Sequence, residues 1–271
     1  MAKKKQKASE GICKLTKLHG VYIESHIIPA ALTKPSVKGN YFLQFGPNQR
    51  LKKRWSSWYD PELVTAEGEK YLSDLDTWAI DELRKYKLVW SGWEGNKLEE
   101  TLHCTVGPFG LRVVEGIDPV KLRLFFLSIL WRAAATSLNE FSYIKLPDED
   151  IERLRLMILN GDPDPQSFYP LQLTQLITKG FVHNHAGIKI DLPPESRESE
   201  KDGTEDLPTY RLYFDGLITH YYLGLPLSYS IENLKGVMVG TADSLIVTTV
   251  PFENSLQYFC MQEAILTSRN G

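Results

Sequence analysis

The first ninety residues change from a strand-like pattern of apolar positions to a helical one. Residues 11–28 alternate enough between apolar and polar positions to predict a β-hairpin, with strands at 12–15 and 21–28 and a turn near 17–20. Pro29 ends the second strand, because proline has no amide hydrogen to donate to a neighbouring strand. From Asp60 the apolar residues recur at helical spacing to about residue 86. Asp60 followed by Pro61 is typical of a helix start, with a capping residue before a proline in the first turn.

The rest of the chain predicts helices and strands that do not alternate regularly. Asp118 followed by Pro119 repeats the same helix start, ahead of a long apolar helix to about residue 139. A second helix is expected at 148–160, ended by Gly161. Asp215 and Gly216 are typical of a tight turn between two strands. Further strands and a last helix are expected at 41–45, 210–223, 236–239 and 245–250, and at 253–268. This mixture predicts the α+β class.

Length and charge indicate how the chain is divided. The chain has 271 residues, of which 42% are hydrophobic, enough to bury a substantial core. Its net charge of −3 hides a contrast: residues 1–54 carry 12 Lys and Arg against two Glu, whereas residues 97–271 carry 15 against 23 Asp and Glu. We therefore expect a disordered basic arm at 1–8, one domain at 9–96 and an α+β domain at 97–271, with a polyanion as partner of the basic end.

Several protein classes are not expected. The longest largely apolar run, residues 124–131, is far shorter than the ~20 residues of a membrane-spanning helix, and no apolar stretch follows the N-terminal lysines as in a signal peptide. Three widely separated cysteines argue against a disulfide framework and indicate a reducing cytoplasm. No glycine-rich phosphate loop is present, so we expect no dependence on ATP or a dinucleotide.

The most informative stretch is the string SHIIP at residues 25–29, where the second expected strand ends. A histidine in that place, followed by a loop and an acidic helix, is typical of a nuclease site. Phosphodiester hydrolysis needs a base that takes a proton from water and a cation that neutralises charge on the scissile phosphate.

On the SHIIP string and the Cys13 that precedes it, the chain resembles the HNH, or His-Me finger, endonucleases. The likeness covers about residues 11–85 and is greatest to bacterial members in which a C-x-x-C knuckle precedes SHIIP and a C-x-x-C-E string opens the helix. It implies a ββα-metal module followed by a mixed α+β domain, with Mg²⁺ or Mn²⁺ at the active site and double-stranded DNA as substrate.

The same resemblance implies roles for particular residues. His26 is the expected general base, and Asn48 is expected to brace the loop and orient it. Glu62 corresponds to the glutamate after the last cysteine and is the expected metal ligand on the helix. Glu69 and Glu24 are further candidate ligands, although strand alternation points Glu24 to the opposite face of the strand from its neighbour.

The chain departs from the family at the zinc knuckle, whose cysteines would stand at 13, 16, 58 and 61. At those positions the chain has Cys13, Thr16, Trp58 and Pro61. One thiol cannot hold a structural zinc, which needs four ligands, so we expect no zinc. Burial of Trp55, Trp58 or Tyr59 is expected to replace it.

A basic cluster precedes the expected helix and ends at the aromatic Trp55. Its members are Arg50, Lys52, Lys53 and Arg54. They could contact the phosphates of a nucleic acid, or they could form an ordinary solvated loop.

The second half of the chain offers weaker signals. Arg132, on the long apolar helix, is expected to form a structural ion pair. His183 and His185 could share one strand face as metal ligands, but no third ligand is evident, so we expect surface histidines. The domain at 97–271 is expected to sense, dock or oligomerise, and one alternative is that it binds a small ligand or partner that licenses the nuclease.

The leading hypothesis is a metal-dependent DNA endonuclease, and analogy alone suggests an effector against foreign DNA such as a phage genome. The alternative is a non-catalytic module for nucleic-acid or protein interaction on a degenerate His-Me finger.

Overall fold

A computed structural model describes residues 9–33, 39–46, 49–192, 207–225 and 230–269, which fold as a mixture of helices and strands. The expected α+β class is therefore confirmed. The basic arm at 1–8 and Asn48 lie outside the described residues. Within them, no helix is both long and apolar enough to cross a membrane.

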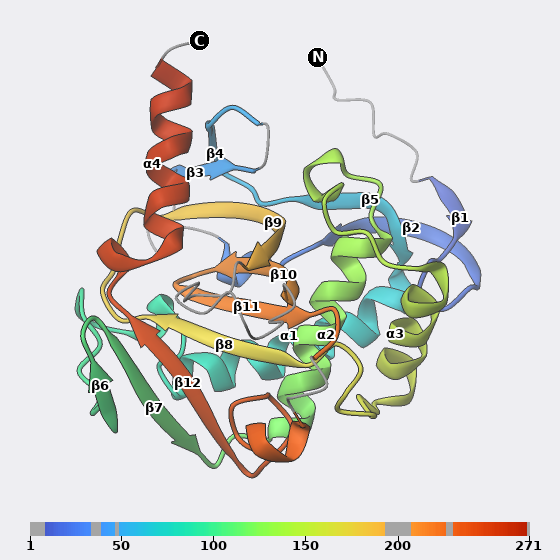
Figure 1. Cartoon of the computed structure of the whole chain (residues 1–271). Helices are drawn as coiled ribbons and strands as arrows, with labels where there is room; N and C mark the ends of the chain where they lie inside the picture. The colour runs from blue at the N-terminus through green and yellow to red at the C-terminus, as the bar shows by residue number, and fades with distance from the viewer. Residues whose placement is uncertain (1–8, 34–38, 47–48, 193–206, 226–229, 270–271) are drawn as a thin grey trace.

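The N-terminal part forms a three-stranded antiparallel sheet with a long helix on it (Figure 1). Its elements are β1 (Glu10–Ile12), β2 (His19–His26), β5 (Tyr59–Thr65) and α1 (Ala66–Lys85). β1 and β2 form the predicted hairpin. β2 pairs in turn with β5, from which α1 continues without a loop.

A nine-stranded sheet forms the centre of the molecule, in the order β4-β3-β9-β10-β11-β8-β12-β7-β6. Its strands are β3 (Phe42–Phe45), β4 (Lys52–Arg54), β6 (Cys104–Val106), β7 (Phe109–Glu115), β8 (Leu171–Leu176), β9 (His183–Leu192), β10 (Leu207–Phe214), β11 (Leu217–Tyr222) and β12 (Ser244–Val250). Neighbours are antiparallel except for β3 with β9 and β8 with β12. The expected turn at Asp215 and Gly216 joins β10 to β11.

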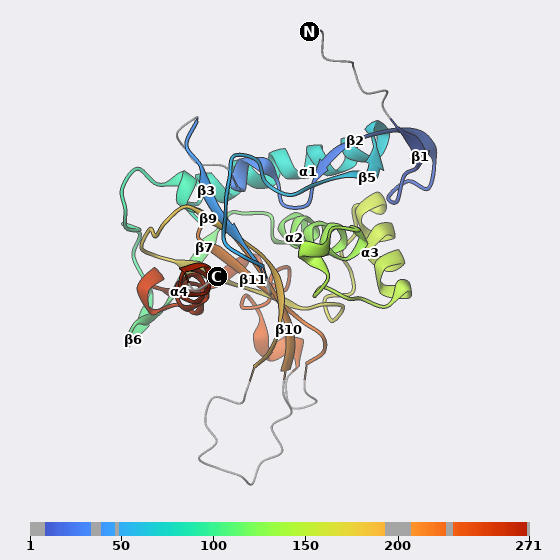
Figure 2. The same cartoon turned by 90° about the horizontal axis from the view of Figure 1, so that it is seen from above.

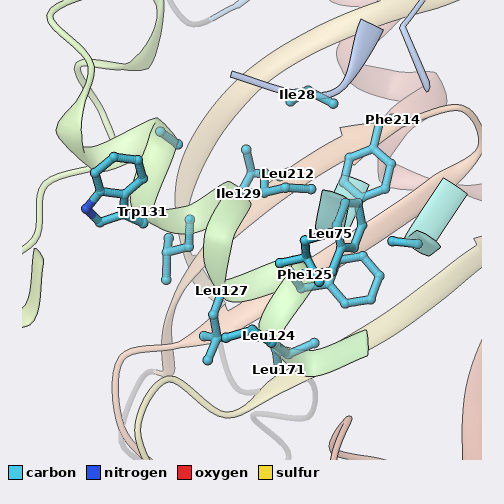
Figure 3. Packing of buried hydrophobic residues seen from close by; sticks show 14 of the residues in the cluster. Ile28, Leu75, Leu124, Phe125, Leu127, Ile129, Trp131, Leu171, Leu212 and Phe214 are labelled. Atoms are coloured by element: carbon cyan, nitrogen blue, oxygen red, sulfur yellow. The ribbon is translucent and has the colours of Figure 1, made fainter. Parts of the chain in front are cut away.

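Helix α2 (Pro119–Ala135) lies between the two sheets, with α3 (Asp148–Asn160) beside it (Figure 2). The side chain of Asp118 accepts hydrogen bonds from the first turn of α2, and Gly161 ends α3 in the left-handed conformation, both as predicted. α2 is apolar almost all round because it is covered on both sides. Figure 3 shows Phe125 and Ile129 among residues of the large sheet, such as Leu212 and Phe214, and of the N-terminal part, such as Ile28 and Leu75.

A second apolar cluster lies on the other face of the large sheet, beneath α4 (Leu256–Arg269). Alternation along β10 explains the two faces: Leu212 and Phe214 belong to the cluster around α2, and Tyr213 belongs to the cluster beneath α4. The core around α2 contains residues from both sides of residue 96, and β3 pairs with β9 across that position. The domain boundary at 96 stays a prediction.

Two expected elements differ from the sequence-based predictions. Residues 60–65 are strand and not the start of a helix, because they pair with β2, and α1 begins only at Ala66. Residues 236–239 do not form a strand and contribute only single bridges.

Candidate active site

Ser25 and His26 lie at the end of β2, next to its partner strand β5. Ser25 pairs with Asp60 and His26 with Tyr59, after an irregularity in the register. Ser25 is completely buried and His26 is half-buried, with its ring centre 6.3 Å from that of Tyr59. At the end of β2 the side chain of Ser25 is therefore inside the protein, and that of His26 is partly exposed.

Glu69, in the first turn of α1, is joined directly to this strand end. The hydroxyl of Ser25 donates a hydrogen bond of 2.7 Å to Oε2 of Glu69. Burial raises the pKa of Glu69 above its usual value, and the hydrogen bond from Ser25 and the charge of Arg132 counteract that rise only in part. Glu69 is thus a half-buried carboxylate that water solvates poorly.

A buried ion pair lies behind His26. Arg132 of α2 donates two hydrogen bonds to the carboxylate of Asp76, at 2.7 and 2.8 Å, in the bidentate geometry that arginine favours. The same guanidinium lies 3.3 Å from the main-chain oxygen of His26, to which it also donates. Asp76 follows Glu69 by seven residues, so both lie on one face of α1. The expectation that Arg132 forms an ion pair is confirmed, and its contact with His26 was not foreseen.

Asp60 joins β5 to the end of α2 instead of capping a helix at residue 61. Its Oδ2 accepts hydrogen bonds from the hydroxyl of Thr136, at 2.6 Å, and from the amide of Ser137. Its Oδ1 accepts from the amide of Glu62. These contacts replace the capping role that the sequence suggested, and they hold α2 against the strand that pairs with His26.

The predicted metal ligands are not all brought together. Glu62 is exposed on strand β5, so the prediction that it is a ligand on a helix is wrong, because the helix begins four residues later. Glu24 is exposed, as alternation along β2 predicts. Glu69 is the predicted ligand that contacts the strand of His26. Within the described part of the chain, no three His, Cys, Asp or Glu side chains gather closely enough to hold a metal ion by themselves.

Cys13 is buried against the start of α1. A Cβ atom added to Gly68 would lie 2.5 Å from its Sγ, and the amide of Thr16 donates a hydrogen bond to that sulfur. Burial alone would raise the pKa of Cys13, but hydrogen bonds with Thr16 and Thr65 outweigh it and lower the pKa. Thr16, Thr65 and Gly68 therefore surround Cys13, the one cysteine that remains of the family's four zinc-knuckle positions.

The aromatic residues expected to fill the place of zinc behave differently from one another. Trp58 is buried and packs edge-to-face on Phe141, with ring centres 5.3 Å apart. Trp55 and Tyr59 are 62% and 40% exposed, so Trp58 is the one of the three candidates that is buried. The expected absence of zinc stays a prediction.

The basic cluster occupies the edge of the large sheet. Lys52, Lys53 and Arg54 form the exposed edge strand β4, and Arg50 is exposed just before it. Lys53 and Arg54 line an open groove of about 470 Å³ together with Trp55 and Tyr59. Tyr59, whose main chain pairs with that of His26, belongs to the wall of this groove.

The two histidines expected on the surface are buried. His183 and His185 lie on β9 under α4, where both interact with the side chain of Gln257, and Phe45 stacks on both rings. Burial lowers their pKa values to about 4 and about 3, so both rings are neutral at pH 7. The sequence pattern gave their common face correctly, but it could not reveal that α4 covers that face.

The sequence analysis missed Asp76 as a residue of this site, and it missed the contact of Arg132 with His26. The seven-residue spacing of Glu69 and Asp76 on one helix face was the available signal for Asp76. Nothing local marked the contact between Arg132 and His26, because 106 residues separate them.

Comparisons of the chain with protein-family models, with curated proteins and with solved structures found no match. The features that remain to indicate a function are the half-buried His26 at the strand end, the carboxylate of Glu69 bonded to the adjacent Ser25, and the groove lined by Lys53 and Arg54.

Proposed function

We propose that this protein is a metal-dependent endonuclease of the HNH type that hydrolyses phosphodiester bonds of DNA. The observation that supports this most is the hydrogen bond between Ser25 and Glu69, which joins the strand that ends at His26 to the first turn of the following helix. A histidine at a strand end and an acid on the next helix are the two groups that such a site requires.

The surroundings of Cys13 support a changed alignment with the resembled family. Thr65 and Gly68 have the spacing of a C-x-x-C pair, and both lie near Cys13. Glu69 directly follows Gly68, as the family's glutamate follows the last cysteine. We therefore assign to Glu69 the role that the sequence alignment gave to Glu62.

A divalent cation fits this site only if the substrate supplies part of its coordination. Mg²⁺ is usually held by one or two carboxylates, together with water and substrate phosphate. Glu69 would provide the carboxylate, and its raised pKa indicates a charge that lacks solvation and that a cation would stabilise. Asp76 is already neutralised by Arg132 and is not available as a second ligand. When bound, the cation would stabilise the charge that develops on the phosphate.

The protein's own residues would bind the substrate and move the proton. Lys53 and Arg54 would contact backbone phosphates along the groove, while Trp55 and Tyr59 offer ring surfaces to unstacked bases. The His26 ring would accept the proton of the attacking water. Arg132 would act as a positioning residue, since it holds the main chain of His26 and is itself fixed by Asp76.

Two observations favour a second candidate, a nucleic-acid-binding module without catalysis. The Nε2 atom of His26 is buried, although a general base must reach the proton that it takes. In addition, Ser25 already uses one oxygen of Glu69. In this case the basic groove would bind DNA and the strand end would have a structural role only.

Cleavage of supercoiled plasmid separates the two candidates. With Mg²⁺ or Mn²⁺, the wild-type protein should convert the plasmid to nicked or linear forms, and His26→Ala should abolish cleavage while DNA affinity stays within about twofold. The double variant Lys53→Gln, Arg54→Gln should bind DNA more weakly. The slope of log affinity against log salt should become shallower by an amount that corresponds to up to about two phosphate contacts. DNA binding without metal-dependent cleavage by the wild type would establish the second candidate instead.

A further inference from the structure

A cavity of about 270 Å³ lies at the large sheet and shares no lining residue with the basic groove. Its wall combines Leu32 and Thr33, which follow the SHIIP string, with the segment after α1 and with the ends of β9 and β10. Its aromatic lining consists of Trp90, Trp93 and Tyr213. Polar and charged residues make up about half of the lining, so the cavity combines aromatic surface with hydrogen-bonding groups, as small-molecule sites do.

Most polar groups of this lining are already engaged with the protein. The indole nitrogens of Trp90 and Trp93 donate to the main-chain oxygens of Leu176 and Lys87, at 2.9 and 2.7 Å. The amide of Asn184 donates to the main-chain oxygen of Thr33. These groups fix the shape of the cavity and do not determine which ligand it takes.

His183 is also engaged and is uncharged. Its Nδ1 lies 2.6 Å from the oxygen of Phe181, its Nε2 lies 2.8 Å from the amide nitrogen of Gln257, and its ring stacks on Tyr213. Because burial lowers its pKa to about 4, it is neutral at pH 7 and adds no charge to the wall.

Two charged groups retain hydrogen-bonding capacity. Oδ2 of Asp215 accepts from the amide of Ser91 at 3.1 Å, and a carboxylate has about four acceptor sites. Nζ of Lys179 donates to the oxygen of Trp93 at 3.1 Å, and an ammonium has three donors. With Glu94, a third charged residue of the lining, the cavity wall therefore carries two carboxylates and one ammonium.

We propose that this cavity binds a guanine-type base, either of a free nucleotide or of an unpaired nucleotide in a strand. Asp215 would accept from the adjacent N1–H and N2–H groups of the base, and Lys179 would donate to O6. Guanine carries these donors and this acceptor on one edge. Adenine offers Asp215 only a single exocyclic donor and has no oxygen for Lys179, so the cavity should discriminate against it.

Charge and size are consistent with a neutral planar ligand. Lys179, Arg84 and Glu94 lie near or in the cavity wall with Asp215, so an organic cation would meet repulsion as well as attraction. The volume is just below the ~300–1,000 Å³ of pockets for drug-sized ligands, which suits a bicyclic base. Burial raises the pKa of Asp215 to about 6, so its carboxylate is ionised at pH 7 and can accept two donors.

The test is calorimetric titration of the full chain in EDTA, so that no cleavage enters the measurement. The probes are guanosine monophosphate, adenosine monophosphate and the oligonucleotides TTGTT and TTATT. We expect at least one guanine probe to bind at least tenfold more tightly than its adenine counterpart. The nucleotide and oligonucleotide arms identify the source of the base.

Asp215→Asn removes one acceptor and keeps the fold, because asparagine tolerates the left-handed conformation of this residue, whose φ is 50°. Its guanine affinity should fall at least tenfold, and Lys179→Met should show the same direction. Asp243→Asn, at an exposed position, should bind like the wild type. Equal binding of guanine and adenine, no guanine binding below 1 mM, or unchanged affinity in both cavity variants would overturn the proposal, whether or not the protein cleaves DNA.

Discussion

The ion pair between Asp76 and Arg132 allows a prediction of stability that can be worked out from its contacts. Asp76→Asn removes the negative charge that faces a guanidinium only 2% exposed. Loss of one member of a buried pair costs about 3–5 kcal/mol, because the other charge stays buried without compensation. Asparagine still offers an oxygen to one N–H of Arg132, and Ser128 also accepts from it, so we expect the lower end, about 3 kcal/mol.

The measurement is equilibrium unfolding in urea, with the free energy of unfolding extrapolated to water. Asp74→Asn is the matched control, because Asp74 lies on the exposed face of the same helix, and it should change stability by less than about 0.5 kcal/mol. Arg132→Met completes a double-mutant cycle. The double variant should lose about 2 kcal/mol less than the sum of the single losses, since neither charge is then left alone.

An Asp76→Asn variant as stable as the Asp74→Asn control would refute this reasoning, because the guanidinium would then not depend on the carboxylate. Strict additivity in the cycle would refute it as well. If Asp76→Asn loses stability and the cycle shows coupling, Asp76 fixes the guanidinium of Arg132, which in turn bonds to the main chain of His26.

Three other changes have expected outcomes. Because burial raises the pKa of Glu69, ionisation of this group makes the folded wild type less stable as pH rises above the ordinary glutamate pKa of about 4.3. The stability of Glu69→Gln relative to wild type should therefore increase with pH in urea unfolding, and a constant difference would contradict the burial of this charge. Gly68→Ala should lose about 1–3 kcal/mol through its clash with Cys13, and Cys13→Ala in the same chain should recover part of the loss. Trp58→Ala should lower the free energy of unfolding by about 3–5 kcal/mol, and Trp55→Ala, at an exposed position, by less than about 0.5 kcal/mol. A chelator should leave the thermal midpoints of both variants unchanged. Equal losses in the two variants, or a midpoint lowered by the chelator, would contradict this.

Local signals were sufficient where the responsible contacts are local. Asp118 caps α2, Gly161 ends α3 and the turn at Asp215 and Gly216 joins two strands, because each depends on backbone geometry within a few residues. The same reasoning failed at Asp60, whose side chain bonds to Thr136 on another element. An aspartate before a proline looks the same in the sequence whether its carboxylate accepts hydrogen bonds from the helix that follows it or from a distant element.

The candidate site divides in the same way. His26 could be found because the SHIIP string marks the end of a strand, and Glu69 because it lies within the helix that the apolar spacing predicts. The shift from Glu62 to Glu69 could not, because it depends on how far β5 extends along β2 before α1 begins. Similarly, the pairing of β3 with β9 brings the basic strand β4 to the edge of the large sheet, and it joins segments far apart in the chain.

Plasmid cleavage by Glu69→Gln and Glu62→Gln, measured side by side with Mg²⁺ or Mn²⁺, provides the sharpest test of the proposed site. Both variants remove one negative charge, and Glu62 is exposed, so Glu62→Gln controls for charge alone. If Glu69 works with His26, Glu69→Gln should lower the cleavage rate at least 100-fold, and Glu62→Gln should keep it within about threefold of the wild type. A wild-type protein without metal-dependent cleavage, or a loss in Glu62→Gln that matches or exceeds the loss in Glu69→Gln, would contradict the assignment.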